Sequence, residues 1–225
     1  KVIEYLCEDD ADQEYKGVHP ICFASENGHL DIVKFFVENG QMHQFDEEDA
    51  LYWASRAGKF DVVKYLVDDA GVSADASGSI ALGIACKEGR LDVVEFLIKK
   101  GANPNALHGY PIWSAAEGGQ IKVLSFLAEK TNADFLAFGH QSLFYACRDG
   151  NLKIAKFLLD RGIRAYAANN SALFWAVEHG HLDIVKLLVE RGANVLAQNN
   201  YSVKTAAMKG HWAIFQYLVS QGAIF

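Results

Sequence analysis

The chain has 225 residues, of which 51% are hydrophobic and 22% charged, and its formal net charge is −7. It contains no run of about 18 apolar residues, so the sequence predicts no membrane-spanning helix. Lys and Arg form no block that could neutralise phosphates, which argues against nucleic acids and anionic membranes as partners.

The four cysteines are spaced without any C-x-x-C pair; they are Cys7, Cys22, Cys86 and Cys147. Cys86 and Cys147 each follow an alanine in a recurring pattern, which is typical of small buried side chains. We therefore expect free thiols in a reducing, intracellular compartment. The spacing predicts neither a disulfide framework nor a zinc site, and no cofactor is expected.

Apolar residues near the N-terminus repeat the pattern of a later helix. Val2, Ile3, Tyr5 and Leu6 align with Ile32, Val33, Phe35 and Phe36. We therefore expect the chain to open inside a helix, and the stop at 221–223 closes another. Both ends are predicted to be cut from a longer array.

A glycine recurs through the chain with gaps of 30, 31, 30, 31, 30 and 30 residues. These glycines are Gly28, Gly58, Gly89, Gly119, Gly150, Gly180 and Gly210. An alanine stands four residues before each of them: Ala24, Ala54, Ala85, Ala115, Ala146, Ala176 and Ala206. An aliphatic residue stands three positions earlier still: Ile21, Leu51, Leu82, Ile112, Leu143, Leu173 and Val203. A fixed period of this length indicates stacked structural repeats.

Each period predicts two short helices joined at the glycine. In 171–194, for example, Leu173, Ala176 and Val177 share one helix face, and Gly180 ends that helix because glycine adopts the left-handed conformation easily. First helices are expected near 20–27, 50–57, 81–88, 111–118, 142–149, 172–179 and 202–209. Second helices are expected near 30–39, 60–69, 91–100, 121–130, 152–161, 182–191 and 212–221. Helices this short need neighbours to be stable.

The unit resembles the ankyrin repeat. The resemblance is carried by His19-Pro20-Ile21-Cys22-Phe23-Ala24, by Gly28-His29-Leu30-Asp31-Ile32-Val33, and by Gly180-His181 through Gly192-Ala193. The Thr-Pro pair is mostly lost, and the unit is about three residues shorter than usual. The shortening falls where the family carries a β-hairpin finger, so we expect short fingers. The Asn-rich linkers are similar to those of ankyrin proteins from large DNA viruses of amoebae.

The resemblance implies an all-α helix-turn-helix solenoid of about seven repeats without enzyme activity. We expect one array over 1–225, with a remnant of a preceding repeat at 1–16. The repeats are expected at 17–46, 47–77, 78–107, 108–138, 139–168, 169–198 and 199–225. The two extra residues, near 69–71 and 130–132, predict small local irregularities only.

In ankyrin-like stacks the first helices line a concave groove that contacts protein partners. The stripe opposite the alanines runs through positions 23, 53, 84, 114, 145, 175 and 205, and we expect it to be exposed. Within it and the adjoining turn, the residues expected to bind a protein are Phe23, Trp53, Arg56, Lys87, Tyr145, Arg148, Trp175, Glu178 and His179. Aromatic rings beside arginine are typical of interface hot spots.

A second interpretation is that these rings only pack against adjacent repeats. Tyr52, Trp113, Phe144 and Phe174, one position earlier, are expected to do so. The centre of the stripe has only Ser114 and Gly118, which predicts two contact zones, one toward each end.

Three further features of the sequence bear on metal binding, catalysis and covalent modification. His179 and His181 form the only H-x-H, but His181 occupies the recurring turn position. The carboxylates of Asp68-Asp69 and Glu47-Glu48-Asp49 are expected in solvated turns. Asn105 occupies a hairpin position at which ankyrin asparagines can be hydroxylated.

The sequence therefore predicts a monomeric protein-binding scaffold whose partner is unknown. Two alternatives stay open. The array could be the targeting arm of a larger enzyme or effector, for example a ubiquitin-ligase adaptor, or it could be a self-associating structural protein.

Overall fold

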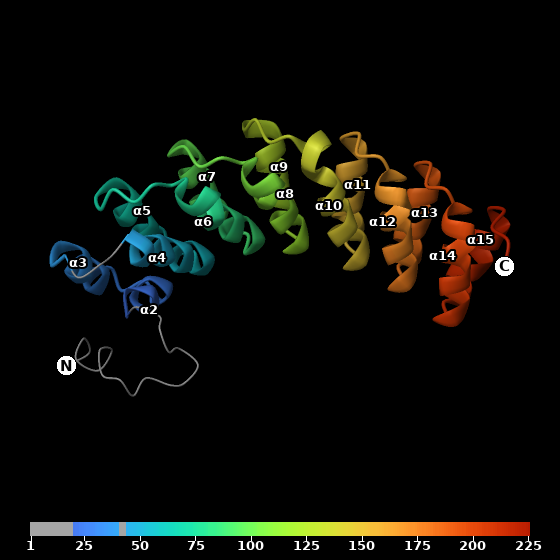
Figure 1. Ribbon diagram of the computed structural model, residues 1–225, viewed down its shortest axis with the longest axis horizontal. Coiled ribbons are helices and arrows are strands. Elements are labelled where there is room, and N and C mark those ends of the chain that lie inside the picture. Colours follow the sequence, from blue (N-terminus) through green and yellow to red (C-terminus); the bar gives the residue numbers. More distant parts are fainter. Residues whose placement is uncertain (1–19, 41–43) are drawn as a thin grey trace.

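The computed structural model describes residues 20–40 and 44–225, which form a curved array of paired helices (Figure 1). The predicted remnant at 1–16 and the start of the first repeat lie outside the described residues. Within the described part, every regular element is a helix and no strand occurs. The all-α helix-turn-helix solenoid is confirmed.

Two layers of helices alternate along the chain. The inner helices are α2 (Pro20–Asn27), α4 (Gln44–Ala57), α6 (Ala76–Lys87), α8 (Ala106–Glu117), α10 (Phe135–Arg148), α12 (Ala167–Glu178) and α14 (Ala197–Met208). The outer helices are α3 (Leu30–Glu38), α5 (Phe60–Asp68), α7 (Leu91–Lys99), α9 (Ile121–Lys130), α11 (Leu152–Asp160), α13 (Leu182–Glu190) and α15 (Trp212–Ser220). Each inner helix contacts the next inner helix and the outer helix that follows it.

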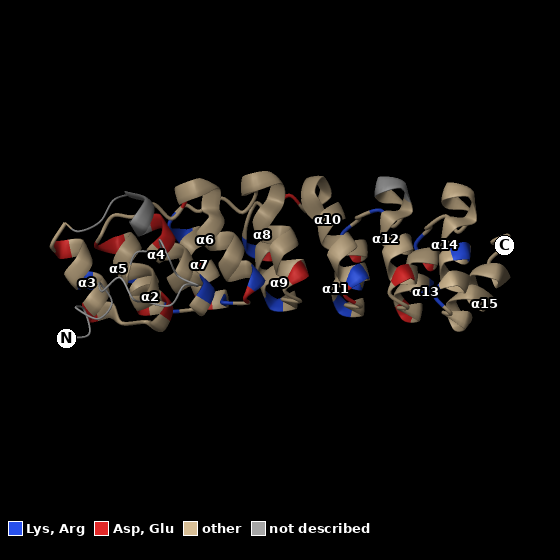
Figure 2. Ribbon diagram, turned by 60° about the horizontal axis from the view of Figure 1, so that its bottom comes forward, with Lys and Arg blue, Asp and Glu red and all other residues tan. Residues whose placement is uncertain are grey.

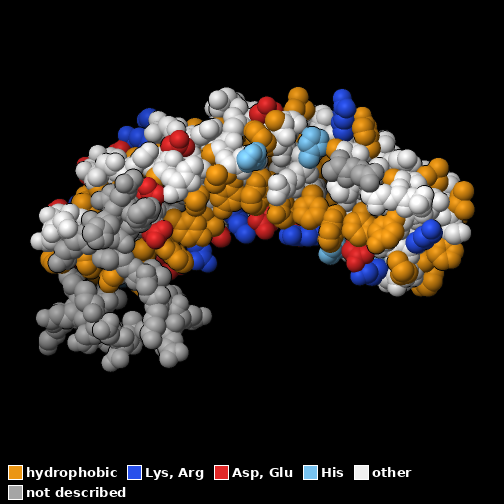
Figure 3. Space-filling view, in the orientation of Figure 1, with side chains coloured by type: hydrophobic (Ala, Val, Ile, Leu, Met, Phe, Trp, Pro, Cys, Tyr) orange, Lys and Arg blue, Asp and Glu red, His pale blue; other side chains and the backbone are white. Residues whose placement is uncertain are grey.

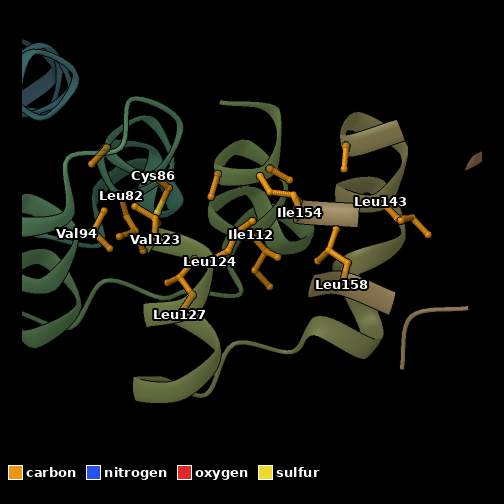
Figure 4. Packing of buried hydrophobic residues seen from close by; sticks show 14 of the residues in the cluster. Leu82, Cys86, Val94, Ile112, Val123, Leu124, Leu127, Leu143, Ile154 and Leu158 are labelled. Atoms are coloured by element: carbon orange, nitrogen blue, oxygen red, sulfur yellow. The ribbon is translucent and has the colours of Figure 1, made fainter. Parts of the chain in front are cut away.

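The core lies between the two layers and runs the length of the array. Leu82, Ile112 and Leu143 of the inner helices lie beside Leu124 and Leu158 of the outer helices (Figure 4). All five are buried. The predicted trio Leu173, Ala176 and Val177 is likewise fully buried, which confirms the helix face read from the spacing. Burying these stripes supplies the stabilisation that isolated short helices lack.

The turn glycines have the backbone expected of them. Gly180 has φ 78° and Gly192 has φ 91°, in the left-handed region where other residues are strained. The two predicted irregularities stay local: α5 ends at Asp68 and α9 at Lys130, and the layers continue beyond both.

The linkers differ from the expected short hairpin fingers. The inner helices after α2 begin five to seven residues earlier than predicted. In α6 the residues Ser77, Gly78 and Ser79 have φ 48°, 68° and 60°, so a left-handed turn leads into the right-handed helix. Asn199 and Asn200 do the same in α14, with φ 55° and 60°. Asparagine and glycine tolerate this conformation best, which explains the Asn-rich linkers.

The linker before α10 takes another route. Here the helix is regular from Phe135 onward, because the Asp134 side chain accepts a hydrogen bond from the Ala137 backbone N–H at 2.9 Å. A capping carboxylate of this kind stabilises a helix start. None of the described helices has both the length and the apolar character needed to cross a bilayer.

Candidate interaction surface

The inner helices line the concave side of the arc, and hydrophobic side chains follow its hollowed underside (Figure 3). The predicted binding residues all lie on these helices or at their C-terminal ends. Seven are half-buried: Phe23, Trp53, Lys87, Tyr145, Arg148, Trp175 and Glu178. Arg56 and His179 are exposed.

An aromatic row spans the C-terminal half of this surface; it consists of Trp113, Phe144, Tyr145, Phe174, Trp175 and Tyr201. Trp113 stacks on Tyr145 of the next repeat, with ring centroids 5.7 Å apart and planes inclined by 21°. Phe144 meets Trp175 edge to face at 5.3 Å. Each ring therefore packs sideways on a neighbour and, because it is only half-buried or exposed, keeps part of its surface accessible.

A smaller group lies toward the N-terminus. The ring of Trp53 meets Tyr52 edge to face at 5.4 Å. The guanidinium of Arg56 lies 5.1 Å from the Trp53 ring centroid, and its Nη1 is 3.7 Å from Glu26 of the preceding repeat. Trp53 and Arg56 thus form one preorganised pair, while Phe23 lies one repeat away on α2.

Charged residues lie mainly along the edge at which the inner helices end (Figure 2). Lys87 Nζ is 3.0 Å from Glu117, and Lys209 Nζ is 2.5 Å from Glu178. Both pairs bridge successive repeats at a half-buried to exposed surface. Pairs in such positions contribute little to stability, but they hold the side chains in fixed places.

Arg148 is held by its own neighbours. It donates to both carboxylate oxygens of Asp149, at 2.6 and 2.9 Å, and its guanidinium lies 4.8 Å from the Tyr145 ring centroid. The hydrogen bond to Asp149 raises the pKa of Arg148 above its ordinary value. Beside it, His179 Nδ1 lies 3.1 Å from the Trp175 carbonyl oxygen.

Three members of the stripe that was expected to be exposed are buried. Ile84 is 6%, Ser114 0% and Thr205 1% exposed, so that part of the prediction is wrong. At Ser114 the cause is the close approach of neighbouring inner helices: its hydroxyl donates to the Gly83 carbonyl across the α6–α8 contact at 2.8 Å. The centre of the surface therefore exposes neither the Ile84 nor the Ser114 side chain.

Tyr110 is a contact residue that the sequence did not reveal. A Cβ added to Gly83 would lie 2.2 Å from its ring, so the tyrosine of α8 packs on the bare glycine of α6. Burial raises the pKa of Tyr110 above its ordinary value. The signal that could have identified it was a glycine in the middle of a predicted helix, which indicates close packing.

Four of the residues that follow a turn glycine link successive repeats. His181 Nε2 lies 3.0 Å from the Arg148 carbonyl oxygen, and His211 Nε2 lies 3.3 Å from that of Glu178. Gln120 and Arg90 donate to the corresponding carbonyls of Lys87 and Arg56, at 3.2 and 3.1 Å. The structural role expected of His181 is thus observed.

The other chemistry finds little support in the arrangement. Among the described residues, no group of three or more His, Cys, Asp or Glu side chains could hold a metal ion. Glu48 and Asp49 lie inside α4, not in a turn as expected, because that helix begins at Gln44. Asp68 ends α5 and pairs with Lys100 at 2.6 Å.

Asn105 bridges two linkers. Its side-chain amide donates to the Asn132 carbonyl at 3.0 Å and accepts from the Asp134 backbone N–H at 2.7 Å. Both ends of the amide are therefore used to hold neighbouring repeats together.

Comparisons with known proteins agree with this geometry. Residues 21–108 and 108–169 match the family described as ankyrin repeats (3 copies), and residues 168–200 match the single ankyrin repeat. The crystal structure of the human ASB11 ankyrin repeat domain superposes with a TM-score of 0.73 at 22% identity, covering 92% of this chain and 99% of that one. The comparison with curated proteins gave no match. Because the family matches span most of the chain, this protein belongs to the ankyrin repeat family.

Proposed function

We propose that this protein is a non-enzymatic scaffold that binds a protein partner through the concave face of its inner helices. The observation that carries the proposal is that half-buried aromatic rings on this face have arginines fixed beside them, as in Trp53 with Arg56 and Tyr145 with Arg148. Rings and guanidinium groups that are already ordered lose little conformational entropy on docking. The same residue types dominate the energetics of known interfaces.

The partner is proposed to engage two zones separated by the α6–α8 contact. One zone is centred on Trp53 and the other on Trp175. Ser114 and Thr205 are buried and contribute nothing to either. A partner that spans both zones gains from two linked contacts, so loss of one zone should weaken binding without abolishing it.

Compartment and assembly are part of the same proposal. The buried free thiols of Cys86 and Cys147 suit an intracellular, reducing environment. The net charge of −7 disfavours a nucleic-acid ligand. We propose a monomer, to be checked by light scattering over a range of concentrations; a mass that rises with concentration would favour a self-associating protein instead.

The test begins with recovery of a partner from cell lysate by pull-down, followed by calorimetric titration of the purified partner. Trp53→Ala and Trp175→Ala should each weaken binding by about 2 kcal/mol or more while the fold is kept. Trp212→Ala is the matched control, because Trp212 is 62% exposed on the outer helix α15. Unchanged affinity in the first two variants, with a lowered melting temperature, would instead assign the rings to packing alone.

A further inference from the structure

A pocket of about 400 Å³ lies between α4 and α6, beside the Trp53 zone. It is lined by Glu48, Asp49, Leu51, Tyr52, Trp53, Ala76, Ser77, Ile80 and Ala81. The buried side chains of Leu51 and Ala81 supply apolar surface. The residues described so far as holding the repeats together leave this space unfilled.

A hydrogen bond fixes the wall of the pocket where the linker enters α6. Ser77, in the left-handed turn that precedes the helical part of α6, donates a hydrogen bond from its hydroxyl to the Glu48 carboxylate of α4. This contact joins two repeats and sets the position of one carboxylate. Asp49, the next residue, is exposed beside it. The site is therefore preorganised before any ligand arrives.

Among the described residues, the lining combines two carboxylates with two aromatic rings and contains no basic side chain. An anionic ligand would meet repulsion from Glu48 and Asp49. A purely apolar ligand would strip water from the carboxylates without replacing its hydrogen bonds, which is costly. A cation with an apolar stem satisfies both parts of the lining. The rings of Tyr52 and Trp53 favour a cation in addition, as the Arg56 guanidinium on Trp53 already illustrates.

We propose that this pocket, called here the α4–α6 pocket, binds an arginine side chain from an extended segment of the partner protein. Arginine fits better than lysine, because its planar guanidinium can pair with carboxylates through two hydrogen bonds and stack on an aromatic ring. The volume lies within the range of about 300–1,000 Å³ found for small-ligand sites, which leaves room for flanking backbone. This inference rests on the proposed function, since it assigns the chemistry of part of the partner.

The direct test uses small probes and the full chain. N-acetyl-arginine N-methylamide is titrated into isotope-labelled protein, with the citrulline and lysine derivatives as comparisons. Saturable NMR shifts are expected at the Trp53 indole and at the Ser77 and Ile80 amides. The neutral citrulline probe should bind at least ten-fold more weakly, and the lysine probe several-fold more weakly. Equal binding of either comparison probe, or shifts without saturation, would overturn the assignment to arginine.

Charge variants locate the interaction. Glu48→Gln keeps an oxygen that can accept from Ser77, so the fold should persist while arginine binding falls at least five-fold. Asp92→Asn, at an exposed carboxylate in the first turn of the outer helix α7, should leave binding unchanged. An equal loss in both variants would show that only the overall negative charge attracts the probe, and would overturn the pocket.

The partner titration separates this inference from the proposed function. If Trp175→Ala weakens partner binding and the Glu48→Gln, Asp49→Asn double variant does not, the scaffold function stands and the arginine pocket is overturned. Weakening of at least ten-fold by the double variant, with the expected probe results, supports the pocket. Unchanged affinity in both overturns the scaffold surface, whatever the probes show.

Discussion

The α6–α8 contact and the α10–α12 contact join successive inner helices by different means. In the first, backbone approaches backbone: a Cβ on Gly118 would lie 1.9 Å from the Lys87 carbonyl oxygen. In the second, the rings of Phe144 and Trp175 separate the helices with centroids 5.3 Å apart. At Gly118 the close backbone contact leaves no side chain that a partner could touch, whereas the half-buried rings used as spacers keep part of their surface exposed. The same repeat can thus pack on its neighbour either through close backbone contact or through aromatic side chains that remain partly exposed.

The largest effect is expected from the core that both contacts share. Leu173→Ala should lower the free energy of unfolding by about 2–5 kcal/mol, because Leu173 is fully buried and the space left behind cannot close completely. Ile112 of α8 is the equivalent residue beside the close contact, and Ile112→Ala should lower the free energy of unfolding by a similar amount. Thermal and urea unfolding followed by circular dichroism give both values. An unshifted Leu173→Ala transition would contradict the assigned helix face.

The close contact itself can be broken by one methyl group. Gly118→Ala should destabilise by about 1–3 kcal/mol, since the new Cβ meets backbone that cannot swing aside. His179 occupies the equivalent position beside the ring-spaced contact and is exposed, so His179→Ala should change stability by less than about 0.5 kcal/mol. Equal effects in urea titrations would mean that the two contacts do not differ as described.

Each of the two contacts includes a helix with a buried thiol, and these two thiols make the free energy of unfolding depend on pH. Burial raises the pKa of Cys86 in α6 and of Cys147 in α10, whereas an unfolded thiol titrates near about 8.5. Above that pH the unfolded chain binds fewer protons, so the stability present at neutral pH is lost as pH rises. Each thiol should contribute on the order of 1 kcal/mol per pH unit.

Cys86→Ala and Cys147→Ala should each remove a similar part of this slope, measured by denaturant unfolding between about pH 8 and pH 10. A slope that survives unchanged in the double variant would show that other groups, such as the half-buried Tyr110, carry it.

The smallest expected effect is on stability, which should rise when one buried hydroxyl is removed and fall when another is removed. Thr205 Oγ1 is buried without a hydrogen-bond partner among the described residues, so Thr205→Val should stabilise by up to about 1 kcal/mol. Ser114 Oγ donates to Gly83, so Ser114→Ala should destabilise by about 1 kcal/mol. Melting temperatures that move in the same direction for both would contradict the hydrogen-bond assignment.

The sequence was sufficient for the fold because each repeat obeys local rules. Leu173, Ala176 and Val177 are buried as their spacing predicted, and Gly180 turns the chain as its missing Cβ allows. Such features depend on residues within one helix pair, and they recur at a fixed period.

The surface could be predicted only in part, because it depends on the distance between repeats. The stripe position of Ser114 is the same as that of Tyr145, yet Ser114 is buried by the approach of α6 to α8. The α4–α6 pocket likewise arises where Glu48 meets Ser77, 29 residues later. No periodicity within a single repeat encodes that separation.

The links made by the residues after the turn glycines have a consequence for how such an array can change in length. His181, His211, Gln120 and Arg90 differ chemically, yet each reaches a backbone carbonyl of the preceding inner helix. A carbonyl is present whatever amino acid occupies that site. Duplication or deletion of a whole repeat would therefore place new neighbours side by side, and these could form the same link without further substitutions. The segment from one turn glycine to the next is thus the unit that can be added or removed.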